Sequence, residues 1–325
     1  MAAFPAIFVV LLALGATDAS IKGSRWKRIP GYLAYVSVGA SGVWGLGSKG
    51  KIWYRVGTYG NEGSTGTSWQ RVSGYLKHIS VGKNIVWGVD YKDYIYLRKG
   101  ITPKNPTGTG WWRIAGKLKK VSASPTSNAM WGVGWNKAIW HLSGSRWKRI
   151  PGYLAYVSVG ASGVWGLGSK GKIWYRVGTY GKEGSTGTSW QRVSGYLKHI
   201  SVGKNIVWGV DYKDYIYYRK GISPKNPTGT GWWRIAGKLK KVSASPTSNA
   251  MWGVGWNKAI HQRTDRSKRE LEIKETLQDL RDILEEADAD VEEAREMEDM
   301  GEDAGMDEDV EKEMRELEDM AGDEE

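Results

Sequence analysis

Tryptophan, tyrosine and lysine recur at fixed positions along this chain, and these residue types indicate what chemistry it can do. The 325 residues include 19 Trp and 17 Tyr. Indole and phenol rings stack on flat apolar ligand faces such as those of sugars, while Lys and Arg hydrogen-bond hydroxyls, carboxylates and phosphates. The composition therefore favours binding over reaction chemistry.

Catalytic and metal sites lack the residues they need. The chain has no Cys, which excludes a cysteine nucleophile and a cysteine-ligated metal. The glycine-rich strings fall in predicted hairpin loops rather than before a helix, so they do not read as phosphate loops. Four His occur without metal-ligand spacing, at His78, His141, His199 and His261. We expect no catalytic residues, no metal and no cofactor.

Two groups of residues are candidates for ligand binding. The first is the Trp of each Val-Trp-Gly-like string, which either packs between repeats or contacts ligand. Its members are Trp44, Trp87, Trp131, Trp165, Trp208 and Trp252. The second group occupies predicted turns, where side chains are exposed. Its members are Lys49, Lys51, Asp90, Tyr91, Lys92, Trp135, Asn136 and Lys137, with their twins Lys170, Lys172, Asp211, Tyr212, Lys213, Trp256, Asn257 and Lys258.

A repeat within a repeat positions these residues. The segment 23–139 recurs at 144–260, and only the pairs Asn61/Lys182, Leu97/Tyr218 and Thr102/Ser223 differ. Within each copy, Trp-x-Arg-(Ile/Val)-x-Gly strings start every 36 to 43 residues, the period of a four-stranded propeller blade. The strings begin at Trp26, Trp69, Trp111, Trp147, Trp190 and Trp232. Their Arg is either a ligand contact or a structural partner on an outer strand, and both alternatives remain open.

These strings, each followed by Val-Trp-Gly-Val-like and Ile-Tyr-like segments, resemble the tectonin repeat. The resemblance covers residues 24–263 and extends to fish egg lectins and tachylectin-type lipopolysaccharide-binding lectins. It implies an all-β, six-bladed β-propeller that binds glycans. Unlike the fish egg lectins, this chain lacks cysteines, so disulfides cannot close its ring.

Ring closure must then rest on strand pairing. If each blade begins with the strand after the Trp-x-Arg string, the sixth blade has three strands, from Leu239 to Gln262. The unused Trp-x-Arg strand is Trp26–Ile29. We predict that this amino-terminal strand completes the sixth blade, since a propeller must join its first and last blades.

The amino terminus resembles a secretory signal. An apolar run, Phe4–Ala16, precedes small residues at a potential signal-peptidase site after Ala19. A buried helix or a membrane anchor are the alternatives, but the run is too short to span a bilayer with margin. We predict a signal peptide at residues 1–19, no transmembrane segment, and a secreted propeller over 20–265 with halves 23–143 and 144–263.

Charge divides the chain near residue 269. Residues 1–269 carry 42 bases and 8 acids, whereas residues 270–325 carry 5 bases and 27 acids. At this boundary Arg266, Lys268 and Arg269 match a furin-like cleavage site, although Ser267 and Glu270 could instead form a helix capping box. We predict processing at 266–269 and an acidic tail or pro-segment at 270–325, helical or disordered. The tail would pair as a short coiled coil or mask the basic body.

The features together predict a secreted, multivalent, non-enzymatic lectin. Its expected ligands are microbial-surface or egg-surface glycans, especially lipopolysaccharide or another anionic polysaccharide, in an innate-defence role. The alternative is a structural or storage protein of an extracellular or egg-coat matrix. Basic charge with aromatics also fits nucleic-acid binding, but the secretory signal argues against that partner.

Overall fold

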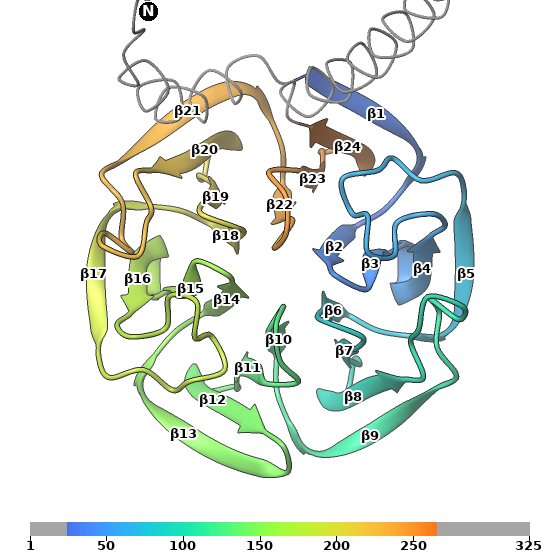
Figure 1. The fold of residues 1–325 in the computed structure, drawn as a ribbon, viewed down its shortest axis with the longest axis horizontal. Helices are drawn as coiled ribbons and strands as arrows, with labels where there is room; N and C mark the ends of the chain where they lie inside the picture. The colour runs from blue at the N-terminus through green and yellow to red at the C-terminus, as the bar shows by residue number, and fades with distance from the viewer. Residues whose placement is uncertain (1–24, 265–325) are drawn as a thin grey trace, which may run out of the picture. The chain divides into compact units, whose positions relative to one another are not determined.

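A computed structural model describes residues 25–264, and in this range 24 strands form six antiparallel sheets of four. The sheets stand radially around a central axis as the blades of a propeller (Figure 1). The all-β, six-bladed prediction is confirmed. The predicted signal peptide, the 266–269 cleavage site and the 270–325 tail lie outside the described residues and stay predictions.

Each blade runs from an inner strand at the axis to an outer strand at the rim (Figure 1). Blade 1 comprises β2 (Tyr35–Gly39), β3 (Gly42–Leu46), β4 (Lys51–Arg55) and β5 (Trp69–Tyr75). Blade 2 comprises β6 (His78–Val81), β7 (Val86–Val89), β8 (Tyr94–Lys99) and β9 (Gly110–Lys117). Blade 3 comprises β10 (Lys120–Ala123), β11 (Met130–Val133), β12 (Ala138–Ser143) and β13 (Arg146–Tyr153).

The second half repeats this plan. Blade 4 comprises β14 (Tyr156–Gly160), β15 (Gly163–Leu167), β16 (Lys172–Arg176) and β17 (Trp190–Tyr196). Blade 5 comprises β18 (His199–Val202), β19 (Val207–Val210), β20 (Tyr215–Lys220) and β21 (Gly231–Lys238). Blade 6 comprises β22 (Lys241–Ala244), β23 (Met251–Val254), β24 (Ala259–Thr264) and β1 (Arg25–Tyr32). Two 3₁₀ turns, η1 (Ser48–Gly50) and η2 (Ser169–Gly171), connect strands in blades 1 and 4.

The amino-terminal strand closes the ring as predicted. β1 pairs antiparallel with β24, and Arg25 lies opposite Thr264 at the end of the ladder. Blade 6 is therefore assembled from both ends of the propeller sequence (Figure 1). This pairing removes the unpaired edge that β24 would otherwise expose.

A ring of serines links the inner strands around the axis. In each blade the hydroxyl of one inner-strand Ser accepts a hydrogen bond from a backbone N–H of the next blade's inner strand, at 2.8 to 3.1 Å. The six acceptors are Ser37, Ser80, Ser122, Ser158, Ser201 and Ser243. The inner strands of neighbouring blades belong to different sheets and do not pair through their backbones. The serine hydroxyls connect them instead, because a hydroxyl oxygen can accept a backbone N–H.

Two sets of connections share one face of the propeller, which we call the turn face. These are the turns between second and third strands and the segments that lead into inner strands. A leucine N–H in each leading segment donates to a carbonyl of the previous blade's turn at 2.9 to 3.1 Å. The six donors are Leu33, Leu76, Leu118, Leu154, Leu197 and Leu239. The turn face is thereby fixed from blade to blade.

Candidate functional site

The Trp-x-Arg-(Ile/Val)-x-Gly string forms the joints between blades. Trp69 of blade 1 donates its Nε1 hydrogen bond to the Pro30 carbonyl of β1, at 2.8 Å. Gly31, at φ +102°, lies beneath this indole, and a Cβ there would stand 3.2 Å from the Trp69 ring. The Trp of one string therefore packs on the Gly of the preceding one. Equivalent indole hydrogen bonds come from Trp26, Trp111, Trp190 and Trp232.

The Arg of the string is a structural partner, which resolves the alternative left open above. Arg71 donates to the Ile52 carbonyl at 3.3 Å and the Gly74 carbonyl at 3.1 Å. Its guanidinium also stacks 5.3 Å from the centre of the Tyr75 ring. Arg28, Arg149 and Arg192 make the same kinds of contact. These donors are therefore used by carbonyls of the third and outer strands of the same blade.

A pocket opens beside each of three such joints, and we call these the junction pockets. Each is lined by the Gly-x-Leu segment that leaves one outer strand, together with the string Trp and a third-strand aromatic of the next blade. Their volumes are about 310, 250 and 220 Å³ for the joints between blades 2 and 3, 6 and 1, and 1 and 2.

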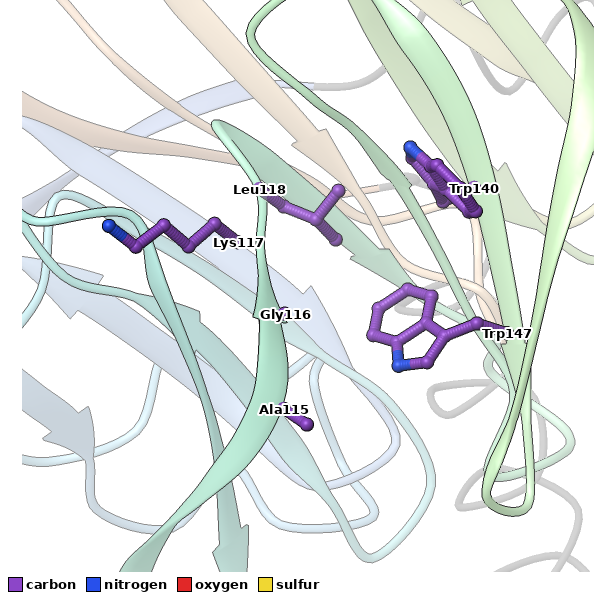
Figure 2. A pocket seen from close by; sticks show the side chains of 6 residues that line it. All are labelled: Ala115, Gly116, Lys117, Leu118, Trp140 and Trp147. Carbon is purple, nitrogen blue, oxygen red and sulfur yellow. The ribbon is translucent and has the colours of Figure 1, made fainter.

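The largest junction pocket is mostly apolar, with two indole rings on one side (Figure 2). The rings of Trp140 and Trp147 meet edge to face, with centroids 6.5 Å apart and planes at 87°. Leu118 faces them from the blade 2 side, and Lys117 extends from the same segment (Figure 2). Gly116, at φ +106°, leaves the space between these walls free of a side chain.

The other two junction pockets add polar groups to the aromatic wall. Between blades 6 and 1, Ser48 and Lys51 line the cavity with Trp53 and Trp69. Lys51 is exposed, so its ammonium group is free to move toward a ligand. This pocket therefore offers hydrogen-bond donors beside two indole rings.

Asp90 supplies an acceptor in the pocket between blades 1 and 2. One of its oxygens accepts from the backbone N–H groups of Lys92 (2.8 Å) and Tyr94 (2.9 Å). The Tyr96 hydroxyl donates to the other oxygen at 3.4 Å. Burial, followed by the charge of Asp90, raises the pKa of Tyr96, which keeps the phenol protonated as a donor. The carboxylate is thus oriented before any ligand arrives.

The repeat implies three kinds of pocket, each present twice. The lining residues recur 121 positions later, except that Trp26, 121 positions earlier, is the counterpart of Trp147, and His261 stands where Trp140 stands. The pair His261 and Trp26 keeps the edge-to-face arrangement, with ring centroids 6.3 Å apart and planes at 89°. The joint between blades 5 and 6 is therefore a variant of the largest pocket.

The six second-strand Trp are not ligand contacts, and this corrects the expectation for Trp44, Trp87, Trp131, Trp165, Trp208 and Trp252. Their side chains are 0 to 3% exposed. Several indoles are held by internal hydrogen bonds, as Trp44 donates to the Ser41 carbonyl at 3.1 Å and Trp131 to the Glu183 carbonyl at 3.1 Å. Since strand residues at this register point between blades, these rings form the core.

The predicted turn residues do lie on the turn face, and two of them reach a described pocket. Lys51 and Asp90 line junction pockets. The others of the first copy stand at the turn tips, namely Lys49, Tyr91, Lys92, Trp135, Asn136 and Lys137. The structure thus spreads the predicted set around the ring rather than gathering it in one place.

Trp135 is a rigid exposed platform on this face. Its side chain is 67% exposed, although its Nε1 donates to Asp93, which also pairs with Lys77. The Lys119 ammonium lies 3.6 Å from the centre of one indole face. The other face is thereby left for a ligand. Trp256 has the same arrangement with Asp214 and Lys240.

The aromatic walls of the junction pockets were not predicted from the sequence. These residues are Trp53, Trp69, Tyr96, Trp111, Trp140 and Trp147. Their signal was present, since the string Trp recurs in every blade, and a third-strand Trp or Tyr recurs in every blade but the sixth, which has His261. The linear sequence does not record the contact between blades, which brings these aromatic side chains onto a Gly-x-Leu segment about 20 to 40 residues earlier in the chain.

Metal-ligand clusters are not found among residues 25–264: no three His, Asp or Glu side chains lie close enough there to hold an ion. Burial lowers the pKa of His141, and nearby Lys148 contributes to the same direction. Burial and then Arg28 lower the pKa of His261. Both imidazoles are neutral near pH 7 and belong to blade packing.

Comparison with known proteins identifies the repeat. Residues 10–134 and 117–291 match the Tectonin domain. None of the curated proteins matches the chain. The β-propeller domain of Myceliophteria thermophila Cps50 (Swd1) is 7% identical and superposes with a TM-score of 0.50, over 74% of this chain and 98% of that one. At this identity the likeness supports the fold alone.

Two further solved propellers are similar at lower scores. Yeast RCC1 (Prp20), solved bound to Kap60, is 12% identical with a TM-score of 0.48, over 71% of this chain and 69% of its own. YCF48 from Cyanidioschyzon merolae is 13% identical with a TM-score of 0.46, over 74% and 83% of the two chains.

Proposed function

Because this chain belongs to the Tectonin domain family, we propose that it is a lectin whose sugar sites are the junction pockets. The observation that carries the proposal is the repetition of one aromatic-walled pocket around a rigid ring. The role is binding without catalysis.

The pocket chemistry suits a sugar ring. The apolar face of a pyranose stacks on an indole such as Trp53, while its hydroxyls need donors and acceptors at the rim. Ser48 and Lys51 offer donors in one pocket, and Asp90 offers an oriented acceptor in another. Pockets of different polarity would accept different sugars, or different parts of one glycan, at the same time.

Multivalency would give this arrangement its strength. Weak sites on one rigid body gain roughly 10² to 10⁴ in avidity when a surface presents several sugars at matching distances. The turn-face hydrogen bonds fix the spacing of the sites, so repeated surface glycans are favoured over free sugars. A bacterial or egg surface presents glycans in this repeated form.

The positive charge of the propeller favours anionic surfaces among these glycan-bearing surfaces. Residues 1–269 carry 42 bases and 8 acids, which would speed the encounter with a negatively charged polysaccharide in a salt-dependent manner. Lipopolysaccharide combines repeated sugars with phosphates and is our proposed ligand class, in an innate-defence role outside the cell. Within residues 25–264, no helix is long and apolar enough to cross a membrane.

The test uses paired variants on a glycan array and in a lipopolysaccharide pull-down at physiological salt. Trp53→Ala combined with Trp174→Ala removes one of the two indole rings from both copies of one pocket and should lower binding at least tenfold. The matched control is Trp112→Ala with Trp233→Ala, since these exposed rings lie on outer strands and pack with Lys99 and Lys220 of the neighbouring third strands. The control should bind like the unmodified protein.

Three results would contradict the proposal. Blank arrays with folded protein would refute sugar binding, and equal losses in both variant pairs would refute the junction pockets as its site. If Trp135→Ala with Trp256→Ala alone abolished binding, the sugar sites would be the turn platforms instead.

A second candidate function rests on the opposite charges of the two parts of the chain. The excess of acids in residues 270–325 could bind the basic propeller, either masking it within one chain or joining chains in an extracellular or egg-coat matrix. Such an assembly should dissolve at high salt and ignore free sugars. A lectin-built assembly should respond to sugars as well.

A further inference from the structure

Six polar side chains meet at the axis of the propeller, apart from the junction pockets. Each is the first residue of an inner strand, at the turn-face end, and the set repeats after half a turn. Its members, which we call the axial ring, are Tyr35, His78, Lys120, Tyr156, His199 and Lys241. This ring has aromatic and cationic members and no carboxylate.

The aromatic members form a packed layer across the axis. The hydroxyls of Tyr35 and Tyr156, from opposite blades, are 3.3 Å apart. His78 lies between them, with its ring centroid 5.2 Å from that of Tyr35 and 6.2 Å from that of Tyr156. His199 is placed alike on the other side, 5.1 Å from Tyr156. The two tyrosines and two histidines therefore close the axis at this level.

Two ammonium groups flank this layer. The Lys120 ammonium lies 4.9 Å from the centre of the Tyr156 ring, and the Lys241 ammonium lies 5.0 Å from the centre of the Tyr35 ring. Both side chains are half-buried. The pKa of each lysine is lowered, first by burial and then by neighbouring ammonium groups. The ion pairs of residues 25–264 are Lys77–Asp93 and Lys198–Asp214, so the axial lysines have no carboxylate partner there.

The histidines leave buried nitrogens without partners. His78 is 7% exposed, and neither of its ring nitrogens has a hydrogen-bond partner. The Nε2 atom of His199 is also unpartnered. Burial, and then Lys120, Lys241 and Lys77, hold the pKa of His78 well below its ordinary value. Buried polar atoms are normally satisfied, so these nitrogens indicate a group that the axial ring is built to receive.

We infer that the axial ring binds a tetrahedral oxyanion, such as phosphate or sulfate, between Lys120 and Lys241. The ring offers the groups such an anion needs: two ammonium groups, tyrosine O–H groups and imidazole N–H groups, all capable of donating. A cation would meet only repulsion from the lysines. An oxyanion would instead neutralise the lysines and hydrogen-bond the orphaned imidazoles.

The inference is independent of the proposed lectin activity, because the axial ring shares no residue with the junction pockets. The oxyanion could be free or could be the terminal phosphate of a larger ligand that approaches from the turn face. A free oxyanion and a terminal phosphate present the same acceptor oxygens to the axial ring. Probes of the two kinds distinguish them.

The first measurement uses the full chain and its own histidines. Inorganic phosphate is titrated at constant ionic strength, with chloride as the balancing ion, while calorimetry counts the sites and ¹⁵N-histidine NMR follows the imidazoles. We expect one site per chain and selective shifts of His78 and His199, with His141 and His261 unchanged. Glucose 6-phosphate is titrated in parallel. Tighter binding than phosphate would indicate a phosphorylated ligand, and weaker binding a free oxyanion.

The second measurement uses matched lysine variants. Lys120→Met with Lys241→Met removes both axial ammonium groups, and since hydrogen bonds to charged groups are the strong ones, phosphate affinity should fall at least tenfold. The control, Lys119→Met with Lys240→Met, changes the preceding lysines, whose ammonium groups lie over Trp135 and Trp256. The control has the same net charge as the test variant and should retain phosphate affinity within twofold.

The inference is overturned if phosphate shifts neither axial histidine, or shifts all four equally. It is also overturned if the control loses as much affinity as the axial variant, since general surface charge would then explain the binding. The histidine spectra of the unmodified chain decide the question even if the axial variant does not fold. Retained phosphate binding in the Trp53→Ala, Trp174→Ala protein would keep this result separate from that of the lectin test.

Discussion

Blade 3 and blade 6 have the same four-stranded architecture, but they differ in chain continuity and in the residues of their third strands. Blade 3 is one continuous stretch, β10 to β13, whereas blade 6 joins β22 to β24 with β1 from the other end of the propeller. Their third strands differ as well, with Trp140 and His141 in one and His261 and Gln262 in the other. Both blades nevertheless hold their places in one ring. A blade therefore does not need a continuous chain or these particular third-strand residues to hold its place.

What a blade requires is contact geometry rather than a particular residue. His261 meets Trp26 edge to face as Trp140 meets Trp147. One position further along the strand, the Gln262 amide donates to the Gly63 carbonyl at 2.7 Å and the Ser64 carbonyl at 3.1 Å. The His141 imidazole hydrogen-bonds the backbone of Gly184, the twin of Gly63. Both side chains fasten a loop of the next blade.

The largest expected effect comes from breaking the closure of blade 6. Removing residues 1–32 deletes β1, exposes the β24 edge and leaves Ile260 without the cover of Ile29. We expect the free energy of unfolding to fall by on the order of 5 kcal/mol, or the protein to lose cooperative folding. Chemical denaturation followed by Trp fluorescence measures this. Removing only residues 1–22 is the control, and equal melting of the two truncated chains would contradict closure by β1.

Acid should weaken the fold through its four histidines. Burial lowers the folded-state pKa of each, so below about pH 6.5 the unfolded chain binds protons that the folded chain does not. Stability is therefore fully present above pH 6.5 and is lost as the pH falls below it, by up to about 1.4 kcal/mol per pH unit for each histidine.

Exchanging the twins sharpens this pH prediction. His141→Gln copies the residue at Gln262 and should reduce the slope by up to about 1.4 kcal/mol per pH unit, because one titrating group is removed. Stability at pH 7.5 should change little, since the twin site already holds glutamine. Denaturation curves from pH 5 to 8 test both points. An unchanged slope would show that His141 does not titrate on unfolding.

The aromatic difference between the blades predicts a difference in binding. Trp140→Ala should weaken ligand binding at the joint of blades 2 and 3 by about fivefold, or about 1 kcal/mol, whereas His261→Trp should strengthen it at the joint of blades 5 and 6. Calorimetry with a glycan from the array tests both. If the two changes leave site number and affinity as they were, Trp140 is a packing residue only.

The smallest expected effect is at a position where the halves differ outright. Leu97 and Tyr218 occupy equivalent positions in blades 2 and 5, and each packs in its blade's apolar cluster. Tyr218 stacks on Trp208, with ring centroids 5.6 Å apart. Leu97→Tyr should change the free energy of unfolding by less than about 1 kcal/mol, because a nearly identical environment already accepts tyrosine. A larger loss would show that the two halves pack differently.

The sequence predicts the fold well because every blade contains the same Trp-x-Arg-(Ile/Val)-x-Gly string. Six copies of one string at blade spacing define the number of blades, and the spare string at Trp26 identifies the closing strand. These features depend on local alternation and on counting, which a linear sequence records directly.

The candidate sites are predicted less completely, because they lie between blades. Lys51 and Asp90 were found as turn residues, but nothing local shows that Trp44 is buried while Trp53 reaches a pocket wall. The axial ring is harder still. Tyr35 and Tyr156 are 121 residues apart and meet only because blades 1 and 4 oppose each other across the axis.

The closure by β1 also has a mechanical consequence. The first pair of its ladder joins Arg25 to Thr264, so the two ends of the described chain leave the propeller from neighbouring positions. A force that pulls these ends apart would load the ladder in the unzipping direction and break its hydrogen bonds one at a time. Tension transmitted through the termini would therefore open blade 6 first, while the continuous blades stayed intact.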